Sequence, residues 1–103
     1  MKARFLIATC LLVSSQISRA DDPGMTLAAQ NACLTCHDIQ QKKIGPPFHA
    51  VAERYRNDPP AFDKLLYKVQ HGGAGNWGNY PMPPNPQANP DDLKAIVKWV
   101  LNQ

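Results

Sequence analysis

The segment with the clearest chemistry is Cys33-Leu34-Thr35-Cys36-His37. Its C-x-x-C-H spacing is the attachment signature of a c-type haem. Two thiols on one turn of backbone can form thioethers with the two vinyl groups of the porphyrin. The histidine that follows can supply an imidazole nitrogen to the iron as the proximal ligand. The sequence therefore predicts one covalently attached haem, bound through Cys33 and Cys36, with His37 on the iron.

The cysteine pair has two other interpretations. A thioredoxin-like dithiol needs a β-α-β context, and no alternating β-branched strand precedes Cys33. A structural zinc site needs four ligands, and beyond the motif the only further cysteines and histidines are Cys10, His49 and His71. We interpret both of these histidines as surface or loop residues. Haem attachment is the favoured hypothesis, and a thiol oxidoreductase remains an alternative.

A second informative segment is residues 72–89, GGAGNWGNYPMPPNPQAN. It holds too many glycines and prolines for a helix or a central strand. It is also longer than the loops that merely connect two elements in a small domain, which indicates a functional loop. At its middle, Met82 stands between Pro81 and Pro83, whose fixed φ angles stiffen the chain. Because this stiff segment would position one thioether sulfur, we expect Met82 to be the second axial ligand. A methionine opposite a histidine favours ferrous iron. The alternative is a core-filling Met82 and an open iron position, as in a gas sensor or a peroxidase-like protein.

The first twenty residues indicate export. Lys2 and Arg4 form a short basic region, residues 5–13 are apolar, and Ser18 and Ala20 put small residues where a signal peptidase cleaves. The apolar run is too short to span a bilayer. We expect residues 1–20 to be a cleaved signal peptide and residues 21–103 to be a single domain.

Cleavage changes the charge balance. The full chain has 11 basic and 8 acidic side chains, and three of the basic ones lie in the signal peptide. The mature chain would keep eight of each, so its formal net charge is zero. The basic charge of the precursor therefore gives no support to a nucleic-acid partner or to an anionic membrane.

The remaining chain is predicted to form short helices joined by proline-rich loops. They are expected at residues 23–32, at 48–56, from about 60 to the glycines at 72–73, and from 90 onward. Asp22 before Pro23, and Asn89 before Pro90, are residue types favoured at the N-cap and the first helical position. No segment alternates with period two, so the expected class is all-α. A domain this small usually needs a covalent or metal link in addition to its apolar core to be stable, and a covalently attached central haem would provide one.

Taken together, these motifs resemble the class I cytochromes c. The closest likeness is to the small monohaem respiratory cytochromes of bacteria, which carry electrons to nitrite reductase or terminal oxidases. The resemblance covers residues 21–103. Besides C-x-x-C-H, it rests on Gly45-Pro46-Pro47, on residues 77–85 (WGNYPMPPN) and on residues 98–101 (KWVL). It implies a small cytochrome c fold, with three to five short helices around one haem.

The resemblance also implies roles for single residues. The carbonyl of Pro46 would accept the second ring N–H of the ligand histidine, and Trp77 would donate its indole N–H to a haem propionate. Asn85 would hydrogen-bond the methionine sulfur or the backbone near it, although a turn-forming asparagine is an equal alternative. Lys68 would stand near a propionate, and a solvated helix lysine is at least as good an interpretation. Where the family often has an aromatic in its first helix, this chain has Leu27 and Ala28, which puts the first helix's contact with the last in doubt.

The implied function is electron transfer, not enzymatic catalysis. Both axial positions of the iron would be filled, so no substrate would coordinate. The carrier would be periplasmic and monomeric, without stable membrane insertion after cleavage. Redox proteins would dock transiently at the exposed haem edge. The docking patch would include Tyr80 and the strap, by which we mean residues 81–86, ringed by lysines such as Lys42 and Lys43.

Overall fold

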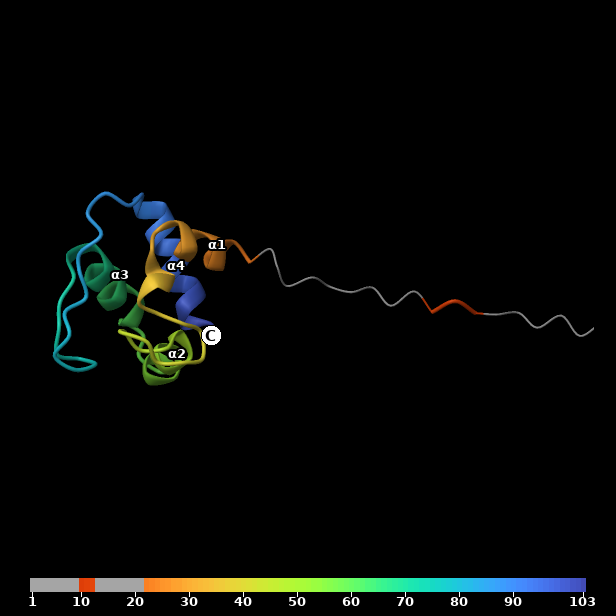
Figure 1. Cartoon of the computed structure of the whole chain (residues 1–103), viewed down its shortest axis with the longest axis horizontal. Helices are drawn as coiled ribbons and strands as arrows, with labels where there is room; N and C mark the ends of the chain where they lie inside the picture. Colours follow the sequence, from red (N-terminus) through yellow and green to blue (C-terminus); the bar gives the residue numbers. More distant parts are fainter. Residues whose placement is uncertain (1–9, 13–21) are drawn as a thin grey trace, which may run out of the picture.

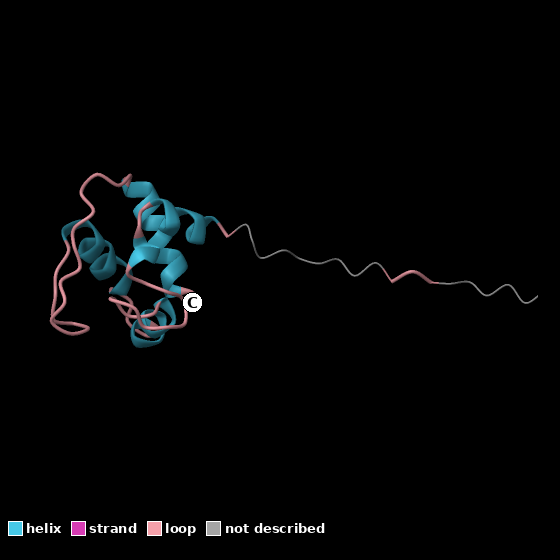
Figure 2. Ribbon diagram, viewed as in Figure 1, coloured by secondary structure: helices cyan, strands magenta, loops and turns pink. Residues whose placement is uncertain are grey.

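The computed structural model describes residues 10–12 and 22–103. The predicted signal peptide and its cleavage after Ala20 lie outside these residues, apart from 10–12, which have no regular secondary structure. The elements are α1 (Pro23–Gln30), a 3-10 turn η2 (Cys33–Thr35), α2 (Phe48–Tyr55), α3 (Ala61–His71) and α4 (Pro90–Leu101). Within the described part of the chain, loops join these helices and no strand forms (Figure 2). The predicted all-α class is confirmed.

Two helices begin where their capping residues predict. Asp22 caps α1, because its Oδ1 accepts a hydrogen bond from the main-chain N–H of Gly24 at 3.0 Å. Asn89 caps α4, because its Oδ1 accepts from the N–H groups of Asp91 and Asp92 at 2.8 and 3.4 Å. Each cap satisfies N–H groups that have no partner inside the helix. The two aspartates also place negative charge at the positive end of the α4 dipole.

The end of α1 corrects the sequence prediction. A helix to residue 32 was expected, but α1 stops at Gln30. The side-chain amide of Asn31 donates to the Leu27 carbonyl at 2.9 Å, and this bond closes the last turn. Ala32 then takes a left-handed conformation with φ of 61°, which non-glycine residues seldom adopt. This reversal turns the chain into η2, which carries the cysteines.

Helix α4 is the centre of the fold. Helices α1, α2 and α3 all pack against it (Figure 1). The residues of the main buried cluster are Ala28, Phe48, Val51, Leu93, Ile96, Trp99 and Val100. On α4 they recur at the three- and four-residue spacing of one helix face. Among residues 10–12 and 22–103, no helix has the length and apolar character needed to cross a membrane.

The contact between the first and last helices is made by small residues on α1. Ala28 is fully buried there. At Gly24, a Cβ atom would stand 2.2 Å from both Cβ and Cγ of Trp99, so the backbone of α1 lies directly on that indole. Trp99 in turn meets Phe48 edge to face, with ring centroids 5.3 Å apart. The aromatic bulk that α1 lacks is supplied by α4, and the contact that the sequence left in doubt is present.

Candidate functional site

The two motif cysteines lie on a tight turn after α1. The N–H groups of Cys36 and His37 both donate to the carbonyl of Cys33, at 3.2 and 2.9 Å. Both cysteines are half-buried. Cys33 faces the larger of two neighbouring hollows and Cys36 faces the smaller. The turn therefore presents two thiols to one site.

His37 is held from three sides. Its Nδ1 lies 2.7 Å from the carbonyl oxygen of Pro46, and a carbonyl can only accept, so Nδ1 is the donor and Nε2 is the ring nitrogen left for a metal ion. The ring stacks on Phe48, with centroids 5.0 Å apart and planes 19° from parallel. A Cβ at Gly45 would stand 2.5 Å from Cε1 of the imidazole. Only a glycine there lets the backbone come close enough for the bond to Pro46.

The chain between His37 and α2 is pinned by its own backbone. The N–H groups of Phe48 and His49 donate to the carbonyls of Asp38 and Ile39, both at 2.9 Å. These bonds bring the Phe48 ring onto the histidine. Within the turn, the carboxylate of Asp38 accepts two main-chain N–H bonds, from Gln41 and Gln40 at 2.8 and 2.9 Å. These bonds, with a smaller contribution from the charge of Lys43, hold the pKa of Asp38 below its ordinary value.

The larger hollow, which we call the main cleft, has an empty volume of about 610 Å³, part of it open to solvent. Its lining is almost entirely apolar and comes from η2 and the chain after it, α2, α3, the 72–89 loop and α4. The lining residues are Cys33, His37, Pro46, Phe48, Val51, Leu65, Lys68, Val69, Trp77, Met82, Ile96, Val97 and Val100. A smaller second cavity of about 320 Å³ is lined by Cys36, His37, Ile44, Gly45, Tyr80, Pro81, Met82 and Pro83. The main cleft has the apolar character of cofactor sites.

Met82 reaches this site from the 72–89 loop, which runs beside α3 in Figure 1. Its main chain pairs with Gly73 in an antiparallel bridge, with N–H to O distances of 2.8 and 3.0 Å. Gly72, with φ of 73°, lies so close that a Cβ there would be 2.5 Å from the Met82 carbonyl. Farther along, the N–H of Asn85 donates to the carbonyl of Val69 on α3 at 3.0 Å. Met82 is therefore positioned by this bridge as well as by its flanking prolines.

The structure brings Lys68 and Trp77 to the main cleft but leaves Asn85 outside its lining. Trp77 is 41% exposed, so its indole is open to solvent on one side. The hydrogen bonds of Asn85 are made by its main chain: its N–H donates to the carbonyl of Val69, and its carbonyl accepts from the N–H of Ala88 at 3.4 Å. Among the described residues, the Asn85 side chain has no hydrogen-bond partner.

These residues fit a covalently attached haem. Two thiols stand on one turn, an imidazole presents a free Nε2, and a thioether faces the same cleft. Soft sulfur and imidazole donors in an apolar slot suit haem iron. The thiol oxidoreductase fits less well, because burial raises the pKa of the Cys33 thiol, whereas a reactive dithiol needs a lowered pKa.

One contact beside the cleft was not predicted. Arg54 on α2 donates from Nη1 to the carbonyl of Asn76 at 2.6 Å, and its guanidinium carbon lies 4.6 Å from the centroid of the Trp77 ring. The sequence has two arginines near the end of α2 and one tryptophan in the loop, but the pairing of Arg54 with Trp77 spans more than twenty residues. No local sequence pattern therefore predicts this contact.

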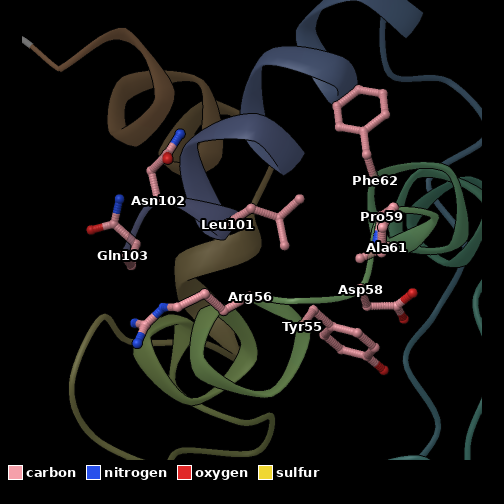
Figure 3. A pocket seen from close by; sticks show the side chains of 9 residues that line it. All are labelled: Tyr55, Arg56, Asp58, Pro59, Ala61, Phe62, Leu101, Asn102 and Gln103. Carbon is pink, nitrogen blue, oxygen red and sulfur yellow. The ribbon is translucent and has the colours of Figure 1, made fainter.

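Another hollow lies between α2, α3 and the end of the chain (Figure 3). Its lining includes Tyr55, Asp58, Phe62 and Leu101, and none of the residues predicted for haem binding. Polar groups from the C-terminal residues open it to solvent. It is separate from the main cleft and carries no part of the haem site.

Comparison with known proteins identifies the family. The model of the family described as Cytochrome c matches residues 22–103. Cytochrome c-551 of Allochromatium vinosum is 44% identical over 77 residues, covering 75% of this chain and 82% of that protein. Cytochrome c-552 of Hydrogenobacter thermophilus is 40% identical over 76 residues, covering 74% and 76%. The crystal structure of Nitrosomonas europaea cytochrome c552 aligns with a TM-score of 0.72 and 36% identity, covering 75% of this chain and 95% of that one. The chain therefore belongs to the cytochrome c family, and it is a class I monohaem electron-transfer protein that carries a c-type haem.

Proposed function

We propose that the protein is an exported electron carrier whose haem is attached through Cys33 and Cys36 and whose iron is ligated by His37 and Met82. One observation carries the assignment of the ligands. His37 and Met82 are the two residues that line both the main cleft and the second cavity. A haem that occupied both hollows would lie against both of these side chains, and an imidazole nitrogen and a thioether sulfur are donors that haem iron takes.

The chain's own residues set the properties of this site. A bound haem supplies one-electron exchange between ferric and ferrous iron. The Pro46 carbonyl fixes the His37 tautomer and raises the basicity of Nε2. The thioether of Met82 favours the ferrous state, and the apolar lining excludes water. If His37 and Met82 both bound the iron, no position on it would be left for a substrate, so we do not propose an enzyme.

Three further residues are proposed at the edge of the site. Trp77 would donate its indole N–H to a propionate, and Lys68 would offer its ammonium group to the same charge. Both line the main cleft. Asn85 would hold the methionine side of the site, through its main-chain bond to Val69 and with its side chain toward the Met82 sulfur.

The proposed docking patch surrounds the second cavity. Ile44 and Tyr80 are 50% and 70% exposed there, and prolines of the strap line the same opening. Lys42 is exposed beside it, whereas the ammonium group of Lys43 donates to the carbonyl of Leu34 at 2.9 Å. We propose that a monomer in the periplasm meets redox partners here through a small, transient contact.

The absorption spectrum of the purified holoprotein tests this function. A covalent haem c spectrum with the weak red band of methionine-ligated ferric haem is expected. In Met82→Ala the red band should vanish while the haem remains attached. A wild-type protein without this band would favour the alternative of an open sixth position, and free titratable thiols at Cys33 and Cys36 would favour the thiol oxidoreductase.

A further inference from the structure

The 72–89 loop is tied to the protein very differently at its base and at its tip. At the base, Gly73 pairs with Met82, and Asn85 bonds to Val69. At the tip, residues 74–80, the main chain makes one internal turn, from the Gly75 N–H to the Gly78 carbonyl at 2.8 Å. Within the described chain, the one hydrogen bond from the tip to a helix is the bond that Arg54 donates.

The tip has little else to hold it. Residues 73–81 are all exposed. Gly75 and Gly78 have φ angles of 102° and 114°, and a Cβ added at either would meet nothing within 4 Å. Glycines in open space gain the most conformational freedom when a segment is released. A tip of this composition needs an external tether to keep one conformation.

Arg54 has the geometry of such a tether. Its guanidinium bonds the carbonyl of Asn76 and lies over the face of the next residue, Trp77, at 4.6 Å from the ring centroid. A planar guanidinium can do both at once, because its N–H groups point outward in the plane while its face stacks on the ring. The Tyr55 ring, at 5.8 Å, lies beside the same guanidinium on α2.

We propose that Arg54 is the positioning residue for Trp77: it clamps the tip of the loop to α2 and so fixes the indole at the edge of the main cleft. This inference deepens the proposed function and rests on it, because Trp77 lines the cleft in which the haem is placed. The clamp acts on the propionate side of the site. It is independent of Met82, which the bridge to Gly73 holds.

Arg54→Met removes both contacts, and Arg56→Met is the matched control. Arg56 is also exposed at the end of α2. In Figure 3 its side chain extends away from Tyr55 and Asp58, toward the side where Gln103 lies. Both substitutions remove one positive charge from the same turn, but only the first releases the loop.

The measurement is NMR relaxation on the ferrous holoprotein. In Arg54→Met, the order parameters of the Asn76 and Trp77 amides should fall from the rigid value of about 0.85 to below about 0.6. The amides of Gly73 and Met82 should stay rigid, and Arg56→Met should leave both sets unchanged. A tip that stays rigid in Arg54→Met, or that is equally mobile in Arg56→Met, would overturn the proposal.

The reduction potential tests whether Arg54 positions Trp77 or only tethers the tip of the loop. It should fall in Arg54→Met by more than in Arg56→Met, because a loose Trp77 no longer offsets the propionate charge. A mobile tip with an unchanged potential would overturn the positioning role. The ferric red band should persist in Arg54→Met. If wild type itself lacks this band, ligation by Met82 fails, while the order parameters still decide the role of Arg54.

Discussion

Replacing Gly24 by alanine tests the closest helix contact in the fold. Gly24 is buried where α1 crosses α4. The Cβ of an alanine would lie 2.2 Å from Cβ and Cγ of Trp99, whereas ordinary contacts begin near 3.4 Å. The helices would have to separate by about 1.2 Å to admit one methyl group. Rotating the Trp99 side chain gives no relief, because its Cβ is fixed to the backbone.

The expected loss of stability is about 2 kcal/mol. Overpacking a well-packed core costs about 1–3 kcal/mol, and the upper end applies because the Cβ of Trp99 cannot turn away from the clash. Against this, exchanging glycine for alanine inside a helix returns up to about 1 kcal/mol. For a domain of this size, a loss of about 2 kcal/mol lowers Tm by roughly 8–16 °C. The helix propensity alone predicts the opposite sign.

The assay is denaturant unfolding of the holoprotein, followed by far-ultraviolet circular dichroism. The control is Thr26→Ala, at an exposed position of the same helix, which should stay within about 0.5 kcal/mol of wild type. If Gly24→Ala is as stable as wild type or more stable, α1 does not approach Trp99 as closely as described. The account of how this chain dispenses with an aromatic in α1 would then be wrong.

Four further outcomes are expected. Replacing both Cys33 and Cys36 by alanine should abolish covalent haem and leave a largely unfolded chain by circular dichroism; a stable helical double mutant would show that haem is not the core. Met82→His should keep haem but lower the potential measured by voltammetry, because imidazole stabilises ferric iron better than a thioether does; an unchanged potential would mean that Met82 is not a ligand. Because the pKa of Asp38 is lowered in the folded protein, the ionised carboxylate stabilises the fold at pH values above its ordinary pKa of 3.8, and this stabilisation is lost as the pH falls through the folded pKa. In Asp38→Asn, the free energy of unfolding should therefore fall less steeply as the solution is acidified. An equally steep fall below about pH 4 would contradict this. Tyr80→Glu should slow oxidation by the native acceptor in stopped flow with little change in potential, and wild-type rates should vary only modestly with salt, since residues 21–103 hold eight basic and eight acidic side chains; a steep salt dependence would move docking to the lysines at 42 and 43.

The helix beginnings could be predicted from sequence because their signals are local. Asp22 and Asn89 each cap the helix that starts at the following proline. The end of α1 could not be predicted, because it depends on the side chain of Asn31 bonding back into the helix and on a left-handed Ala32. The close contact between Gly24 and Trp99 could not be predicted either, because a glycine near the start of one helix gives no information about a tryptophan on another.

The contacts of the haem site likewise fall into those that could be predicted from the sequence and those that could not. The bond from His37 to Pro46 spans nine residues and follows from a motif, and the structure contains it. The bridge between Gly73 and Met82 and the contact of Arg54 with the loop tip depend on how the loop folds back over α3 and α2. Such contacts join segments whose sequences carry no mutual signal. Local motifs therefore nominate the residues that could bear the chemistry, whereas the contacts that hold those residues in place emerge only from the fold.

The two proposed iron ligands are held by structures of unequal strength. His37 lies four residues beyond the first motif cysteine, on a turn closed by hydrogen bonds and backed by the Phe48 ring. Met82 depends on a loop whose base is tied by a two-residue bridge and one bond to α3. Local opening begins where few buried contacts and exposed hydrogen bonds coincide. Opening of the loop would therefore free Met82 while His37 and both cysteines stay in place, so if Met82 binds the iron we expect local opening of this loop to be the route to an open sixth position.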